Sequence, residues 1–309
     1  MAAFLMAWTA AALALPLDQR VPGGVAVVEL GAAPVAPQVS LEGRPLAVVR
    51  ESGRWYALVG IALETPPGPL PLEIRAGGST RELAIVVAPK TFPAQHLRIA
   101  DANRVNPTPE DLVRIDQERD LTEAIKLRFS PTMPATTLTL PATGRLSSRF
   151  GLRRYFNGEL RNPHSGLDVA APTGTRVSAP ADGIVVGVRD YFFNGNTVFI
   201  DHGQGLITAA MHLSRTDVSE GKAVRQGDPI GRVGATGRVT GPHLHWGLVL
   251  NHAWVDPELF VQRSEGHDAP NVDGGPDPKT VDPMQLQGRQ LQSVVACGLA
   301  LRKEKERTL

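Results

Sequence analysis

The sequence predicts a mainly β protein: a small N-terminal β sandwich or barrel, a linker with one helix, and a second β domain towards the C-terminus. Turn-forming residues are plentiful, with 31 glycines and 26 prolines among 309 residues, whereas aromatic residues make up only 5%. Apolar residues come in short runs between these turns, a pattern typical of β structure. Hydrophobic residues at 42% and charged residues at 20% are ordinary for a globular protein, and the length suffices for two domains plus extra segments.

Residues 1–16 are predicted to be a secretory signal peptide. The chain is largely apolar from Met1 to Leu17, too short and too rich in alanine for a membrane span, and Ala12-Leu13-Ala14 fits a cleavage site. No Lys or Arg precedes this run, so an uncleaved anchor in the inner membrane is the alternative. In both cases we expect an exported protein of the periplasm or cell envelope. The single cysteine, Cys297, excludes an internal disulfide framework, which leaves the fold to packed cores and a metal ion.

Residues 17–90 are predicted to form the N-terminal β domain. Strand-length apolar runs alternate with turn sequences such as "EGRP", "PPGPLP" and "AGGS". The runs are "VAVVEL", "RWYALVGIAL", "PLEIRA" and "ELAIVVA". Residues 21–87 contain no histidine and no catalytic cluster, so we interpret this domain as a structural or targeting module.

Residues 91–137 are predicted to be a linker with one helix. Thr108 suits the N-cap, Pro109 the first helical position, and Glu110 and Asp111 the positive end of the helix dipole. A partial apolar stripe follows at Leu112, Ile115, Leu121 and Ile125.

Residues 138–263 return to strand-like segments, and no amphipathic run of helix length interrupts them. The segments are "RVSAP", "GIVVGVRD", "NTVFIDHG", "GLITAAMHL", "PIGRVG" and "HLHWGLVLN". Residues 264–309 open with a Gly-, Pro- and Asp-rich stretch and are predicted to be a flexible tail, in which Cys297 is a free thiol without function.

The stretch "RNPHSGLDVAAPTGTRV" places His164 four residues before Asp168. Pro163, Gly166 and Pro172 argue against a helix here, so a loop that runs into a strand has to aim both side chains. Taken alone the pair is weak, because a histidine near an aspartate is more often an ordinary surface pair.

The stretch "TGPHLHWGLVLN" alternates His243 and His245 with Leu244 and Trp246, which is strand periodicity. Both imidazoles must share one face, and burying two such rings is costly unless they have a task. An exposed polar face is the ordinary alternative, and the apolar neighbours disfavour it. His212 adds a third position near the end of "LITAAMHL".

Four of the eight histidines thus lie in three short segments, with an aspartate beside one of them. Imidazole and carboxylate ligands suit Zn²⁺, and a catalytic zinc keeps three protein ligands and one open position. The remaining two histidines are then available as a base and as a transition-state stabiliser. The other four histidines do not cluster with further candidate site residues and are predicted to be structural or surface residues: His96, His202, His252 and His267.

Three segments, "SSRFGLRRYFNGELRNPHSGLD", "NTVFIDHGQGLITAAMHLS" and "GATGRVTGPHLHWGLVLN", resemble the signature of the lysostaphin-type, LytM-like zinc endopeptidases of peptidoglycan. The resemblance covers about Ser147 to Phe260, and H-x-x-x-D followed by H-x-H is highly specific. "SSRFG" and the segment near Asn106 are also similar to Gram-negative members with an N-terminal β domain. The resemblance to the lysostaphin-type endopeptidases implies that residues 138–263 form an antiparallel β catalytic domain of lysostaphin/LytM type.

The resemblance also implies the site residues. By this resemblance the zinc ligands are His164, Asp168 and His245, and the catalytic residues that do not bind the metal are His212 and His243. The implied partners are peptidoglycan stem peptides, with the D-alanyl–meso-diaminopimelate cross-link as the bond in a Gram-negative wall. The net charge of +1 gives no reason to expect nucleic acid. One departure is Ala210, where the family often has an aromatic residue.

Three alternatives remain. A catalytically inactive relative that binds and activates other wall hydrolases usually lacks a zinc ligand, and this chain keeps all five positions. A lipoyl- or biotinyl-type carrier needs a modifiable lysine at a hairpin tip, and "RDYFFNGNTV" has none. A two-histidine, one-carboxylate iron oxygenase commonly uses H-x-D or H-x-E spacing, and would leave His212 and His243 without a task.

Overall fold

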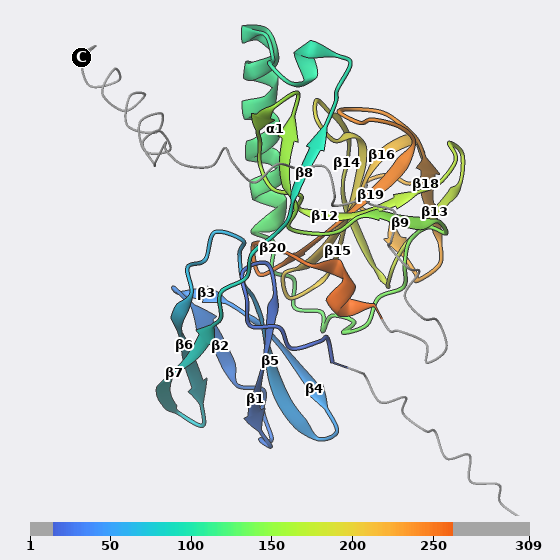
Figure 1. The fold of residues 1–309 in the computed structure, drawn as a ribbon. Coiled ribbons are helices and arrows are strands. Elements are labelled where there is room, and N and C mark those ends of the chain that lie inside the picture. The colour runs from blue at the N-terminus through green and yellow to red at the C-terminus, as the bar shows by residue number, and fades with distance from the viewer. Residues whose placement is uncertain (1–14, 262–309) are drawn as a thin grey trace, which may run out of the picture. The chain divides into compact units, whose positions relative to one another are not determined.

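The computed structural model describes residues 15–261 and confirms a mainly β protein with one α-helix (Figure 1). Nearly all of the predicted leader, and the predicted tail with Cys297 and His267, lie outside the described residues. Among the residues that the structure describes, no helix is long and apolar enough to cross a membrane.

The N-terminal part consists of two antiparallel sheets, and the four apolar runs quoted above all form strands in them. One sheet has the order β1-β5-β4, with β1 (Val25–Gly31), β4 (Ala47–Glu51) and β5 (Arg54–Gly60). The other has the order β3-β2-β6-β7, with β2 (Gln38–Leu41), β3 (Arg44–Pro45), β6 (Gly68–Ala76) and β7 (Ser79–Val87).

The β1-β5-β4 sheet is covered on both faces, because successive strand residues point to opposite sides. Val48 and Ala57 belong to the core between the two N-terminal sheets. Their neighbours Val49 and Leu58 belong instead to the large core of the C-terminal part. The two β parts therefore share apolar packing through this one sheet.

The predicted linker contains more than one helix. The α-helix α1 (Pro109–Lys126) begins as predicted: the Asp111 amide donates to Thr108 Oγ1 at 3.2 Å, and the Thr108 amide donates back to Asp111 Oδ2 at 3.3 Å. A strand, β8 (Ala94–Leu97), and a 3-10 helix, η1 (Ala102–Arg104), precede it and were not predicted.

The apolar stripe expected on α1 is only partly used. No residue of α1 is buried, and Leu112 and Leu121 are exposed. Ile125 is the exception, because it packs on the sheet at Gly187, where a Cβ atom would lie 2.9 Å from Ile125 Cδ1.

The C-terminal part is a ten-stranded antiparallel sheet with the central order β17-β14-β15-β16-β19-β12-β9. Its strands are β9 (Arg145–Ser148), β12 (Gly166–Ala170), β13 (Arg176–Ser178), β14 (Gly183–Tyr191), β15 (Gly195–Gly203), β16 (Leu206–Thr216), β17 (Ala223–Val224), β18 (Pro229–Val233), β19 (His243–Leu250) and β20 (Ala253–Val255). A small sheet joins the hairpin of β10 (Arg153–Phe156) and β11 (Glu159–Leu160) to β8, which pairs with β10 in parallel. A 3-10 helix, η2 (Pro257–Phe260), closes the described part.

Candidate metal centre

The pairing of β12 with β19 places Asp168 directly opposite His245. Leu167 and Trp246, the next pair, point to the opposite face and are fully buried in the core. Asp168 Oδ1 lies 2.7 Å from His245 Nδ1. The His245 ring occupies the space beside Gly166, where a Cβ atom would lie 2.8 Å from His245 Nε2.

His164 joins this pair from the loop before β12. Its Nδ1 lies 2.6 Å from the carbonyl oxygen of Arg149, which can only accept, so Nδ1 carries the proton. The bare Nε2 atom faces Asp168 Oδ1 at 2.8 Å and His245 Nδ1 at 2.9 Å. Two imidazoles and a carboxylate, predicted from the sequence to share a metal, are thus brought together and buried.

The proton count of this triangle fits a cation. The atoms that face one another are His164 Nε2, Asp168 Oδ1 and His245 Nδ1, and all three can bind a metal through a lone pair. With the His164 proton held on Nδ1 by the Arg149 carbonyl, at most one proton, on His245 Nδ1, is shared among them. A cation at the centre satisfies all three. Two imidazole nitrogens and one carboxylate oxygen are a donor set that suits Zn²⁺, with one position left open.

The electrostatics of the ligands agree with this. Burial lowers the pKa of His245 to about 4, so the ring is neutral near pH 7. Burial acts to raise the pKa of Asp168, but hydrogen bonding to His164 and His245 outweighs it and holds that pKa well below its usual value. The site therefore offers an ionised Asp168 carboxylate and a neutral His245 ring, the protonation states that metal ligands need.

Arg154 supports the aspartate and was not singled out by the sequence. Its Nη2 donates to Asp168 Oδ2 at 2.6 Å, while its Nε donates to Gln95 Oε1 at 3.2 Å. Gln95 in turn donates to Ser148 Oγ at 3.0 Å. No sequence signal separates Arg154 from its neighbour Arg153, because only the position of β10 in the folded chain decides which of them reaches Asp168.

His212 reaches the site through a β-bulge. β15 advances two residues from Asn196 to Val198, while β16 takes three between Leu213 and Ala210. Ala210 and Leu213 consequently both face the large core, and His212 adopts a positive φ of 62°. The extra residue turns the His212 ring towards His245, with the ring centroids 5.9 Å apart.

His212 and His243 present the same ring atom to the site. His212 Nδ1 lies 2.9 Å from the Thr236 carbonyl, and His243 Nδ1 lies 2.8 Å from the Gly241 carbonyl. Both rings therefore hold their proton on Nδ1 and keep Nε2 free. The ring centroids are 4.8 Å apart, and His243 Nε2 lies 3.8 Å from Asp168 Oδ1. Burial, followed by unfavourable electrostatic interaction with His243 and His245, holds the pKa of His212 well below its usual value.

The histidines predicted to be structural or surface residues lie elsewhere. His202 is buried, with Nδ1 at 2.7 Å from the Asp182 carbonyl and Nε2 at 2.8 Å from Thr208 Oγ1. His96 is exposed and stacks on Tyr155, and His252 pairs with Glu123.

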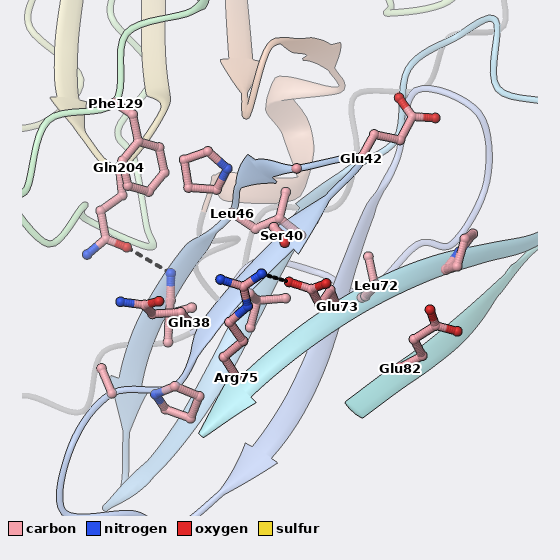
Figure 2. A pocket seen from close by; sticks show the side chains of 17 residues that line it. Gln38, Ser40, Glu42, Leu46, Leu72, Glu73, Arg75, Glu82, Phe129 and Gln204 are labelled. Atoms are coloured by element: carbon pink, nitrogen blue, oxygen red, sulfur yellow. Dashed lines mark hydrogen bonds and ion pairs between the residues drawn. The ribbon is translucent and has the colours of Figure 1, made fainter. Parts of the chain in front are cut away.

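A cleft of about 300 Å³ opens onto the site, lined by Asp168 and His243 together with Gln95, Arg154 and Arg238. A larger hollow of about 850 Å³ lies by the N-terminal sheets (Figure 2). Figure 2 shows its ion pair between Arg75 and Glu73, at 2.7 Å, and none of the five candidate site residues lines it. Of these two hollows, the smaller one is therefore the one that adjoins the candidate metal centre.

Two protein-family models match this chain. The model described as Peptidase family M23 matches residues 162–257, which include all five candidate residues. The model described as Peptidase family M23 N-terminal domain matches residues 18–90, the segment that contains β1 to β7.

Individual proteins, among them one of known structure, are also similar to this chain. Peptidoglycan DD-endopeptidase ShyC of Vibrio cholerae is 44% identical over 115 residues, which are 37% of this chain and 26% of that protein. DD-carboxypeptidase/endopeptidase Mpg of Neisseria meningitidis is 44% identical over 113 residues, again 37% of this chain and 26% of the relative. The chain spans about a quarter of the length of these relatives. A crystal structure of a Pseudomonas aeruginosa protein assigned to peptidase M23 is 47% identical, with a TM-score of 0.68, and the match covers 79% of this chain and 96% of that one.

Proposed function

The chain belongs to peptidase family M23, and from this premise we propose that it is a zinc-dependent endopeptidase that hydrolyses peptide cross-links of bacterial peptidoglycan. The resemblance to LytM-like peptidases seen in the sequence is thereby confirmed. The observation that carries the proposal is the convergence of His164, Asp168 and His245 on one buried point that opens into a cleft.

We assign the metal to these three residues and propose zinc because of their donor set. When bound there, zinc supplies a water of lowered pKa, about 7, and polarises the scissile carbonyl. Arg154 holds the second oxygen of Asp168, which leaves Oδ1 alone to face the two rings. The carboxylate thus stays ionised and in one orientation.

His212 and His243 are proposed as the catalytic pair. Each has a free Nε2, so each can accept the proton of the attacking water, and the imidazolium that results can donate Nε2–H to the developing oxyanion. Because both Nδ1 protons are held by backbone carbonyls, neither ring needs to reorient before the reaction.

The substrate and the location follow from the relatives. One relative is a peptidoglycan DD-endopeptidase and another a DD-carboxypeptidase/endopeptidase, which supports peptidoglycan stem peptides as substrate and the cell envelope as location. The inactive-regulator alternative is disfavoured because the metal triad and both further histidines are assembled.

Digestion of purified sacculi tests the proposal. We expect cross-linked muropeptide dimers to disappear with the zinc-loaded protein, to persist with a chelator, and to disappear again when zinc is restored. His245→Ala should be inactive, while the exposed His96→Ala serves as the matched control and should retain activity. Persistence of dimers with zinc-loaded, folded protein would show that the proposed function is wrong.

A further inference from the structure

Arg238 forms part of the cleft wall beside the metal centre. Its guanidinium contacts two phenyl rings, with Cζ 4.4 Å from the Phe156 ring centroid and 4.2 Å from that of Phe193. The two cation–π contacts restrain the planar group, and its N–H donors lie at its edge. The backbone is restrained as well, because the Arg238 amide donates to the Phe193 carbonyl at 2.8 Å.

The charge of Arg238 is not matched by a carboxylate. Two neighbouring arginines have one: Arg154 pairs with Asp168, and Arg161 pairs with Glu159. Among the described residues no carboxylate oxygen lies within 4.0 Å of the Arg238 guanidinium, and its one protein acceptor is the Arg104 carbonyl at 3.4 Å. Burial, then the charges of Arg154 and Arg161, lowers the pKa of Arg238 to about 10, so the group is still cationic at neutral pH.

We propose that Arg238 is a subsite for a free carboxylate that the peptide substrate carries next to the scissile bond. The proposal rests on the function proposed above and adds a specificity-determining residue to it. A restrained guanidinium edge in a partly desolvated cleft is suited to bind a carboxylate through charge-assisted hydrogen bonds.

The chemistry of the cross-link supplies such a carboxylate. In a D-alanyl–meso-diaminopimelate bond, the carbon attached to the scissile nitrogen carries a free carboxylate. A D-alanyl–D-alanine terminus has the same arrangement. In an ordinary peptide bond that carbon carries an uncharged amide carbonyl instead. One cation at this place therefore separates DD-type bonds from the peptide bonds of proteins.

Two substrates that differ in one group test the subsite. The first is a cross-linked stem-peptide dimer with the free carboxylate beside the scissile nitrogen, and the second is the same dimer with that carboxylate amidated. For the zinc-loaded wild type we expect kcat/KM to be about 10- to 100-fold higher on the free acid. Arg238→Gln should lose activity on the free acid, mainly through KM, and cleave both dimers equally.

Two further variants separate recognition from structure. Arg238→Lys keeps the charge and should keep part of the preference. Arg161→Gln is the matched control, because Arg161 has its own carboxylate and does not line the cleft; its preference should equal that of the wild type. An indifferent wild type, or an Arg238→Gln variant that loses the same factor on both dimers, would overturn the proposal.

Binding distinguishes this inference from the proposed function. Calorimetric titration of both dimers into the metal-free protein, prepared with a chelator, measures recognition without turnover. Tighter binding of the free acid that Arg238→Gln abolishes supports the subsite even if neither dimer is cleaved, in which case only the proposed function fails. Equal binding of both dimers to the wild type rejects the subsite whatever the activity.

Discussion

At the scale of single residues, the two histidines of "HLH" share a strand face but differ in the atom that they present. His245 points Nδ1 at the proposed metal ligands Asp168 and His164, whereas the Nδ1 of His243 donates to the Gly241 carbonyl and its Nε2 stays free. The difference cannot be predicted from the alternation in the sequence, which only places both rings on one side.

This difference predicts distinct defects. His245→Ala removes one of three ligands and should abolish both zinc binding and activity. His243→Ala and His212→Ala should keep zinc and lose about 10²–10⁴ in rate. Atomic spectroscopy and turnover on the same samples measure both quantities. Zinc loss in His243→Ala with retention in His245→Ala would reverse the ligand assignment.

His202 predicts a pH dependence of stability. Burial lowers the pKa of this ring in the folded protein, so the unfolded chain binds the proton more readily. The stability that the neutral His202 ring contributes is therefore fully present above the pKa of this ring in the unfolded chain, about 6.5, and is lost as the pH falls below it. In denaturant titrations of the metal-free protein, the free energy of unfolding should decrease between about pH 7.5 and 5.5.

The contribution of His202 is isolated by replacing it. His202→Gln cannot bind the additional proton, so its decrease with falling pH should be smaller than that of the wild type. Equal slopes for the two proteins would place the pH dependence in other groups.

At the scale of elements, the strands that the sequence predicted are those with clear apolar runs, such as β14, β15 and β19. β8 was not predicted because "AQHL" is short and half polar, and its pairing with β10 supplies what its own pattern lacks. The bulge at His212 was not predicted either. One inserted residue does not disturb the apolar run "LITAAM", although it decides which way the next ring points.

One side chain of the β10–β11 hairpin, that of Asn157, holds the segment that follows β8. Asn157 occupies the turn with φ of 52°, its Oδ1 accepts from the Ile99 amide at 2.9 Å, and its Nδ2 donates to the Ile99 carbonyl at 3.0 Å. Glycine tolerates this backbone conformation but lacks the amide group. Asn157→Gly therefore removes the contact to Ile99 without straining the turn.

We expect Asn157→Gly to loosen residues 94–99. Hydrogen exchange of their amides should accelerate, because two hydrogen bonds to the segment are lost. KM should rise as well, since Gln95 both lines the cleft and bonds Arg154. Zinc content serves as the internal control and should not change. Unaltered hydrogen exchange in residues 94–99 would show that the Asn157 side chain does not restrain this segment.

At the scale of the molecule, the two β parts are predicted to unfold together. Val49 and Leu58 are buried in the C-terminal core, and Gly60 lies so close to β19 that a Cβ atom would stand 2.3 Å from the Leu250 carbonyl oxygen. A fragment of residues 138–261 leaves this apolar surface uncovered. It should be far less stable and less soluble than residues 15–261.

Calorimetry checks the cooperativity. Residues 15–261 should show one transition with equal calorimetric and van't Hoff enthalpies. Two separate transitions, or a fragment 138–261 as stable as the longer chain, would show that the shared core contributes little.

The shared sheet also constrains how such a protein can be recombined or can diverge. The two family models match residues 18–90 and 162–257 as separate modules, yet Val49 and Leu58 of the first pack inside the core of the second. In a chimera whose N-terminal module comes from a relative, the core side chains of that module have volumes that fit the C-terminal core of the relative and not that of this chain. Substitutions on this face of β4 and β5 should therefore be epistatic with those on β19, so that the two modules diverge as a pair.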